Sequence, residues 1–345
     1  MSMPQNCPRL SVVVNNYNYD AYLREALDSA LAQMAAGDEL IVVDDGSTDD
    51  SISILRHYEQ EHGIRLFEQR NQGQMRAVRN GIGAAQGDVI LLLDSDDFFL
   101  EGYLDRLRSI YRQNPDVAFV FSEPDVRGTD IAGVKETRDI LAHMTFPPGK
   151  VGQTKWAGLL FSEFVGVPTS GVSLKKSLAE KIMSLPDSID TTVKISATKK
   201  FFLGISEHEA SKFGFAADAI IVRCASALGV DKYYNDQPGF MYRIHGSNKY
   251  AAVPKWGRWY MRRSRKRAIA KLFSDHFSID LHPTTTELYD EFQKRSLPLH
   301  LRRRLRLRLN YCLALLTSRG SVIQKLSALL TTAGLRRVDT AETKP

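Results

Sequence analysis

The sequence contains little cysteine and no long apolar run. Its three cysteines, Cys7, Cys224 and Cys312, are far apart, so they fit neither a zinc site nor a disulfide framework and indicate a reducing compartment. No apolar stretch approaches the ~20 residues that are needed to span a bilayer. The N-terminus lacks the basic and apolar regions of a signal peptide. We therefore expect a cytoplasmic protein that is soluble or attached peripherally to the cytoplasmic face of a membrane.

Positive charge is distributed unevenly along the 345 residues. The net charge is +6, but residues 255–308 contain fifteen lysines and arginines against five acidic residues. The rest of the chain therefore carries a net negative charge. Hydrophobic residues make up 43% of the sequence and charged residues 25%, which is typical of a protein with a globular core. This layout predicts a folded acidic body followed by a basic C-terminal segment.

Apolar runs and segments of helical periodicity alternate over roughly the first 120 residues. The apolar runs predict buried strands, and the periodic segments between them predict helices. Such alternation predicts an α/β fold with a mostly parallel sheet and helices on both faces, in which ligands bind beyond the carboxyl ends of the strands. We expect strands at 10–14, 39–43, 65–68, 89–93 and 117–121, and helices at 22–34, 48–62, 74–85 and 104–114.

The rest of the chain is less regular. Residues 122–166 have little periodicity and contain several glycines and prolines, so we expect loops there. Beyond residue 253 the sequence becomes basic and helical in character. Between these regions we expect strands at 171–174 and 238–244, and helices at 176–183 and 216–228.

An acidic cluster, Asp94-Ser95-Asp96-Asp97, comes directly after an apolar strand. Carboxylates crowded at a strand end repel one another and are costly to desolvate, and a divalent cation removes both problems. Oxygen ligands suit Mg²⁺ or Mn²⁺, which bind through one or two carboxylates together with substrate phosphates. The alternative is an ordinary helix N-cap, which needs no metal.

Two other strand ends are also polar. In Asp44-Asp45-Gly46-Ser47, one carboxylate can accept hydrogen bonds from a nucleobase or a ribose, although a plain turn and helix cap is the alternative. In the segment 15–18, Tyr17 or the following Tyr19 can stack on a base, or can simply pack in the loop. Because the carboxyl ends of parallel strands meet at one edge, we expect all three segments to line one cleft.

These motifs resemble glycosyltransferase family 2, which has the GT-A fold. The resemblance covers the N-terminal ~125 residues and rests on the order and spacing of the motifs. They are Ser-Val-Val-Val-Asn-Asn-Tyr-Asn at 11–18, Ile-Val-Val-Asp-Asp-Gly-Ser-Thr-Asp at 41–49, Asn-Gln-Gly-Gln at 71–74, Gly81-Ile82, Ala-Gln-Gly-Asp at 85–88, and Leu-Leu-Asp-Ser-Asp-Asp at 92–97.

The resemblance implies a nucleotide-sugar donor, UDP-linked by family habit, and a Mg²⁺ or Mn²⁺ cofactor. It implies a nucleotide-binding half at 1–125, an acceptor-binding half at 126–252 and a basic helical segment at 253–345. One departure is that Arg79 stands where the family usually has Asn, unless that Asn is shifted by one place to Asn80. The roles of Arg79 and Arg76 are open, between contact with the diphosphate and a solvated helix face. We expect the nucleotide to contact Asn15, Tyr17, Asp45, Arg76, Asp94 and Ser95, and the metal site to comprise Asp96, Asp97 and His245.

The family reaction usually inverts the anomeric carbon, with an acidic general base that opens a helix upstream of a Tyr-Arg-x-His-Gly motif. That motif matches residues 242–246, and Asp218 is the corresponding candidate base. Ala217 replaces the usual Glu beside it. Glu207 and Glu209 are competing acids, and an ordinary helix cap is the alternative role for Asp218.

The basic segment suits an anionic membrane surface, because residues 255–316 mix cations with Trp256, Trp259 and leucines. The alternative is a solvated helical appendage or a dimer interface. Nucleic acid is not expected as a partner, since the acidic strand ends would repel its phosphates.

The predicted function is therefore transfer of a sugar to a glycan or glycolipid acceptor in bacterial-type surface glycan synthesis. The rivals are a catalytically impaired sugar-nucleotide-binding homologue and a sugar-phosphate nucleotidyltransferase.

Overall fold

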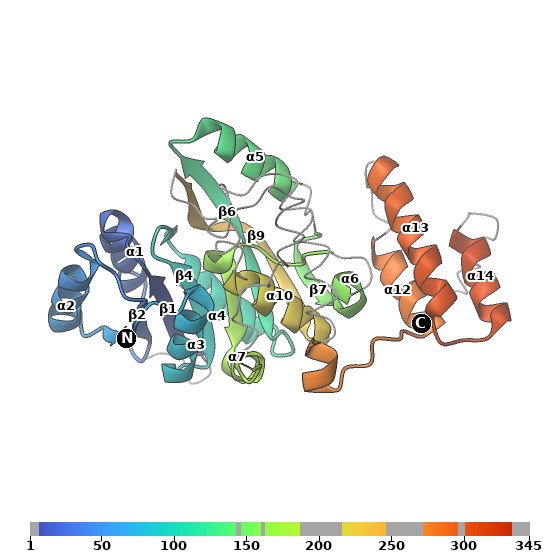
Figure 1. Ribbon diagram of the computed structural model, residues 1–345, viewed down its shortest axis with the longest axis horizontal. Helices are drawn as coiled ribbons and strands as arrows, with labels where there is room; N and C mark the ends of the chain where they lie inside the picture. The colour runs from blue at the N-terminus through green and yellow to red at the C-terminus, as the bar shows by residue number, and fades with distance from the viewer. Residues whose placement is uncertain are drawn as a thin grey trace, which may run out of the picture.

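The computed structural model describes residues 7–142, 146–159, 163–186, 216–245, 272–295 and 301–332. Figure 1 shows a central sheet with helices on both of its faces and a further group of helices to one side, near the C-terminus. The predicted α/β fold class is thus confirmed. The segments 187–215 and 246–271, which include Glu207, Glu209, Trp256 and Trp259, lie outside the described residues.

The N-terminal half follows the alternation that the sequence predicts. Its strands and helices begin and end within about three residues of the expected bounds, in keeping with the usual uncertainty of helix and strand ends. They are β1 (Leu10–Asn16), α1 (Asp20–Leu31), β2 (Glu39–Asp44), α2 (Ser51–His62), β3 (Arg65–Glu68), α3 (Gln74–Ala84), β4 (Val89–Asp94), β5 (Phe98–Phe99) and α4 (Tyr103–Gln113).

The second half is more regular than the sequence predicts. The expectation of loops over 122–166 is wrong, because the strand that begins at Phe119 continues to Gly128 and is followed by helices and another strand. The last strand also begins seven residues earlier than expected. The elements are β6 (Phe119–Gly128), α5 (Ile131–Ala142), β7 (Gly149–Gln153), α6 (Lys155–Leu159), β8 (Val172–Lys175), α7 (Lys176–Met183), α10 (Ala217–Ala227) and β9 (Asp231–Ile244).

One sheet in the order β3-β2-β1-β4-β8-β6-β9-β5 runs through both halves, and β7 pairs with β9. Strands β1 to β4 are parallel, whereas β8 runs antiparallel to both β4 and β6. The register places Asn16 beside Asp44 and Asn15 beside Asp94. The polar strand ends that the sequence singles out therefore meet at one edge of the sheet.

Two apolar cores cover the two faces of the sheet. Because successive side chains of a strand point to opposite faces, β1 gives Val13 to one core and Val12 and Val14 to the other. Helices α3, α7 and α10 pack on the first face, and α1, α2 and α4 pack on the second. The carboxyl edge between these layers is left for polar groups.

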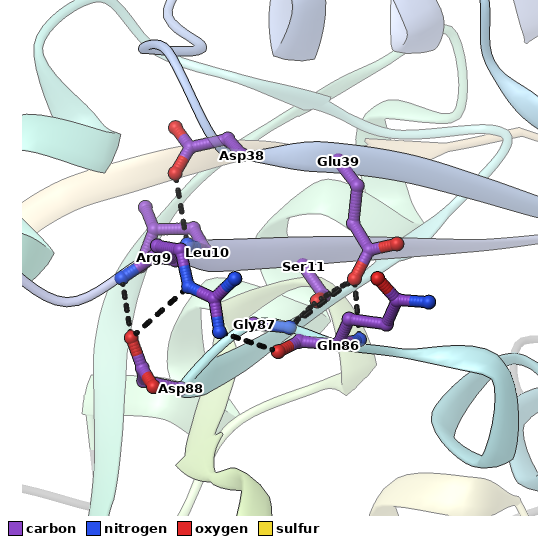
Figure 2. A network of polar contacts seen from close by, with 8 residues as sticks. All are labelled: Arg9, Leu10, Ser11, Asp38, Glu39, Gln86, Gly87 and Asp88. Carbon is purple, nitrogen blue, oxygen red and sulfur yellow. Dashed lines mark hydrogen bonds and ion pairs between the residues drawn. The ribbon is translucent and has the colours of Figure 1, made fainter.

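The opposite edge, where β1 and β2 begin, is closed by paired polar groups (Figure 2). Glu39 accepts hydrogen bonds from the hydroxyl of Ser11 and the backbone N–H groups of Gln86 and Gly87. Burial alone would raise the pKa of Glu39, but these bonds and Arg65 hold that pKa below its ordinary value. The charge of Glu39 at this edge is therefore stabilised by groups of the protein itself and needs no ligand.

The three C-terminal helices are α12 (Thr285–Arg295), α13 (Leu301–Thr317) and α14 (Val322–Thr332). They share a small apolar core in which the rings of Phe292 and Tyr311 stack with centroids 4.4 Å apart. Helix α12 lies against α6 of the main body. Among the described residues, no helix combines the length and the apolar character that crossing a bilayer requires.

Helix α3 packs closely on the sheet at Gly81. A Cβ there would collide with Val13 and lie 3.3 Å from Val43. We predict that Gly81→Ala lowers the free energy of unfolding by about 1–3 kcal/mol through overpacking. Gly83→Ala is the matched control, because its Cβ would meet open space, and it should stabilise the helix by up to about 1 kcal/mol. Urea unfolding measures both, and equal effects of the two substitutions would contradict the packing.

Candidate active site

Three carboxylates gather where β4 ends. Asp94, Asp96 and Asp97 each offer an oxygen, and these oxygens lie within 4.8 Å of one another. A tight turn brings them together, since the N–H of Asp97 donates to the carbonyl of Asp94 at 3.0 Å. Asp96 and Asp97 are buried, and Asp94 is partly exposed. This is the cluster that the sequence predicts at the end of this strand.

The cluster is electrostatically unfavourable by itself. Burial and the neighbouring Asp96 raise the pKa of Asp94 to about 7, and burial, Asp96 and Asp94 raise the pKa of Asp97 well above its ordinary value. Three hard oxygen donors at this spacing fit a divalent cation such as Mg²⁺ or Mn²⁺, which would offset the repulsion. The roles of Asp96 and Asp97 as metal ligands remain predictions.

Two residues that the sequence analysis did not select hold the cluster in place. The hydroxyl of Ser170 donates to Asp97 at 2.6 Å and accepts from the N–H of Asp94 at 3.1 Å. Arg243 donates its backbone N–H to Asp97 at 2.9 Å and its Nε to the carbonyl of Asp96 at 2.9 Å. Arg243 belongs to the Tyr-Arg-x-His-Gly motif, but no pattern in the sequence marks Ser170.

His245 reaches the cluster from the end of β9. Its Nε2 lies 3.1 Å from Oδ2 of Asp96, and the side chain is 7% exposed. The rings of Tyr19 and Tyr22 pack around the imidazole, with centroids 5.6 and 5.0 Å away. Tyr19 is the tyrosine of this loop that contacts the acidic cluster, whereas Tyr17 is 38% exposed. Stacking of Tyr17 on a base therefore stays a prediction.

Asp45 is buried and fixes the loop that leads into α3. Its oxygens accept from Nε2 of Gln69 and from the backbone N–H groups of Gln72 and Gly73, each at 2.7 Å. Gly46, the next residue, lies close to the same loop. A Cβ on Gly46, whose φ is +76°, would lie 2.8 Å from the backbone nitrogen of Asn71. Asp45 thus holds this loop at the carboxyl edge of the sheet, and its contact with a base stays a prediction.

Asn15 and Ser95 lie beneath the acidic cluster. The side chain of Asn15 hydrogen-bonds Asp94, and the backbone carbonyl of Asn15 accepts the N–H of Ser95 at 3.3 Å. Among the described residues, no group hydrogen-bonds the buried Oδ1 of Asn15 or the buried hydroxyl of Ser95. Buried polar atoms of this kind usually have a partner, so both are suited to a polar ligand.

The two arginines of α3 differ in their surroundings. Nη1 of Arg79 donates to the carbonyls of Met183 and Leu185 at 2.9 and 2.7 Å, so Arg79 caps the end of α7. Its departure from the family pattern therefore has a structural explanation. Arg76 lies in the first turn of the helix and is half-buried, and its contact with the nucleotide stays a prediction.

Asp218 lies in the first turn of α10, near the acidic cluster. Burial raises its pKa to about 6, against the opposing effects of the Ala219 N–H and Arg223, and its charge also raises the pKa of Asp94. Gln74, the last residue of the Asn-Gln-Gly-Gln motif, was not among the expected site residues, but it links Asp94 to the start of α10. Its Nε2 donates to Asp94 at 2.7 Å, and its Oε1 accepts the N–H of Ala217 at 3.3 Å.

Comparison with known proteins indicates the class of protein to which this fold and site belong. Residues 11–159 match the sequence model of "Glycosyl transferase family 2". An uncharacterized glycosyltransferase of Nostoc sp. is 29% identical over 255 residues, covering 71% of this chain and 67% of that protein. An uncharacterized glycosyltransferase of Haemophilus influenzae is 39% identical over 111 residues, covering 32% of this chain and 44% of that protein.

A solved structure supports the same fold. The crystal structure of S. aureus TarS residues 1–349 in complex with UDP-GlcNAc matches 94% of this chain and 71% of that chain, with a TM-score of 0.51 and 14% sequence identity. Residues 11–159 of the chain thus match glycosyltransferase family 2, and the fold is the GT-A fold.

The raised pKa of Asp94 predicts how stability depends on pH. The unfolded aspartate ionises near 3.8 and the folded one near 7, so the folded state loses stability as pH rises between these values. Without metal, Asp94→Asn should therefore stabilise the protein by about 1–2 kcal/mol at pH 8 and have little effect at pH 4. Thermal unfolding of both proteins across pH measures this difference. A stabilisation by Asp94→Asn that is smaller at pH 8 than at pH 4 would contradict the prediction.

Proposed function

We propose that this glycosyltransferase moves a sugar from a nucleoside diphosphate to an acceptor hydroxyl with inversion, and that it depends on a divalent metal. The observation that carries the proposal is the cluster of Asp94, Asp96 and Asp97, whose oxygens lie within 4.8 Å of one another at the carboxyl edge of the sheet. Ligands of open α/β sheets bind at this edge. Residues 1–125 would bind the donor and 126–252 the acceptor, across one continuous sheet.

The donor would lie along the ends of β1, β2 and β4. The nucleobase and ribose would contact Asn15, Tyr17, Asp45, Asp94 and Ser95, and the diphosphate would lie near Arg76. The unpaired buried oxygens of Asn15 and Ser95 support a polar ligand here. A UDP-sugar is the favoured donor, because the structurally similar TarS binds UDP-GlcNAc.

Asp96 and Asp97 would hold Mg²⁺ or Mn²⁺ together with the diphosphate. When bound, such an ion stabilises the negative charge that develops on the departing nucleoside diphosphate. Ser170 and Arg243 both orient the carboxylate of Asp97. His245, proposed as part of this metal site, holds Oδ2 of Asp96 through Nε2.

Asp218 would act as the general base. A carboxylate with a pKa of about 6 is mostly ionised at pH 7 and yet accepts a proton more readily than an ordinary aspartate. Gln74 ties the start of α10 to Asp94, which keeps this base at the acidic edge. Asp218 would take the proton from the acceptor hydroxyl as its oxygen attacks the anomeric carbon, while the diphosphate leaves from the opposite face.

The acceptor would be a glycan or glycolipid of surface polysaccharide synthesis, made at the cytoplasmic face of a membrane. The raised pKa of Asp218 favours an active enzyme over the impaired homologue, since a base is present despite Ala217 in place of the usual Glu. The sugar-phosphate nucleotidyltransferase is disfavoured because no glycine-rich, Arg-containing phosphate loop follows the first strand.

Metal-coupled donor binding tests the site. We expect Asp96→Ala to weaken binding of UDP in the presence of Mn²⁺ by at least about 10-fold, because a ligand to the metal and diphosphate is lost. Isothermal titration with and without Mn²⁺ measures the coupling. Asp116→Ala is the control, since Asp116 is exposed and pairs with Lys150. Unchanged coupling in Asp96→Ala would remove the metal from the proposal.

The base is tested separately. Asp218→Asn should lower the rate of sugar transfer by roughly 10²–10⁴-fold, because the amide cannot accept the proton. Its affinity for UDP and Mn²⁺ should stay close to wild type, since Asp218 contacts neither in this scheme. Initial rates of UDP release with acceptor, beside the same binding titration, measure both. Near-normal turnover would exclude Asp218 and leave Glu207 or Glu209 as the base.

A further inference from the structure

Helices α13 and α14 expose an unusual amount of apolar surface. Of the ten large hydrophobic side chains that are exposed in the described part of the chain, seven lie on these two helices. A monomeric protein rarely leaves such side chains grouped on its surface without a partner. They are Leu309, Leu313 and Leu316 on α13, and Val322, Ile323, Leu326 and Leu330 on α14, with exposed fractions between 45% and 79%.

The exposed residues form stripes opposite the helical core. On α13, Leu309, Leu313 and Leu316 follow the i, i+4, i+7 spacing of one helix face, while Tyr311 and Leu315 point into the core. On α14, the four exposed residues likewise lie across the helix from the buried Ala328. In Figure 1 the two helices stand side by side at the end of the molecule farthest from β1 and β2. This pair of stripes is called the apolar face below.

The segment that carries the apolar face has charge of one sign. Residues 301–332 contain seven arginines and lysines and no aspartate or glutamate. One of these cations, Arg319, pairs with Asp280, and the acids of the neighbouring α12 lie outside the segment. An apolar face on a segment whose charged residues are all cations is complementary to a surface that is apolar below and anionic above, which is the interface of an anionic lipid bilayer.

The same charges argue against the other occupants. A second copy of the chain would bring together two segments 301–332 that each contain seven cations and no carboxylate of their own. The basic stretch 246–271 of the chain itself contains nine cations and no acid, so it is a poor cover for this face. The absence of a membrane-crossing helix among the described residues is compatible with attachment from one side.

We propose that the apolar face of α13 and α14 docks the enzyme on an anionic membrane, with its leucine, isoleucine and valine side chains among the acyl chains and its arginines at the headgroups. The apolar face begins within the segment 255–316 that was expected to contact a membrane, and it continues beyond that segment to residue 330. It would suit a lipid-linked acceptor for the proposed function, because it would hold the enzyme at the bilayer surface. This last step rests on the proposed function, whereas docking itself does not.

Vesicle pelleting of the full chain tests the docking. Vesicles of phosphatidylcholine with phosphatidylglycerol should pellet the wild type, vesicles of phosphatidylcholine alone should pellet it far less, and salt should weaken the binding. The double variant Ile323→Ser, Leu326→Ser should bind the anionic vesicles at least about 10-fold more weakly. Ile131→Ser on α5 is the matched control, because Ile131 is 77% exposed and lies on the main body.

Three results would overturn the proposal: no pelleting with anionic vesicles, equal pelleting of the double variant, or a wild-type dimer that the double variant converts to a monomer in analytical ultracentrifugation. The last result would assign the face to a second copy. Titration of UDP with Mn²⁺ on the same samples tests the proposed function separately from membrane docking. A protein that binds vesicles but not UDP would refute the proposed function alone, and the reverse would refute docking alone.

Discussion

The repulsion between the carboxylates of Asp94, Asp96 and Asp97 is the constraint on which the site depends. Folding forces these groups together at a cost, as the raised pKa values of Asp94 and Asp97 show. Hydrogen bonds from Ser170 and Arg243 hold the arrangement in spite of that cost. Both donors come from far along the chain, so the cluster exists only once the whole sheet is assembled. An arrangement that is strained and yet firmly supported is typical of a functional site.

The parts of this site that lie at strand ends could be predicted from the sequence. Continuous apolar runs mark β1, β2 and β4, and the residues that follow them, such as Asn15, Asp45 and Asp94, must meet at one edge if the strands are parallel. Strand direction alone brings these residues together, whatever contacts their side chains make. Their neighbours could therefore be predicted, but their roles could not.

The residues that support the cluster could not be predicted in this way. Ser170 precedes a short strand that runs antiparallel to β4, so its contact with Asp97 depends on a reversal of direction that the alternation does not reveal. Gln74 acts through one hydrogen bond to Asp94 and another to the backbone N–H of Ala217. Tertiary contacts of this kind leave no periodic signal.

The lengths of strands β6 and β9 were underestimated for a related reason. Pro124 in β6 and Pro238 in β9 interrupt the apolar pattern, and proline is usually found at edges or bulges of sheets. The pairing of β6 with β9 shifts register between Ser122 and Pro124, which accommodates the proline. The two strands continue beyond it and carry Arg243 to the catalytic edge.

The two edges of the sheet separate stability from function. At the amino edge, the carboxylate of Glu39 is matched by donors, and its pKa falls below the ordinary value. At the carboxyl edge, burial and the neighbouring Asp96 raise the pKa of Asp94 to about 7, against the hydrogen bonds from Asn15 and Gln74. The difference is that Glu39 has a cationic partner in Arg65, whereas burial and like charges act together on Asp94. A sequence that gathers acids at one edge of a sheet and pairs them at the other leaves the unbalanced edge as the place where a cationic ligand gains the most.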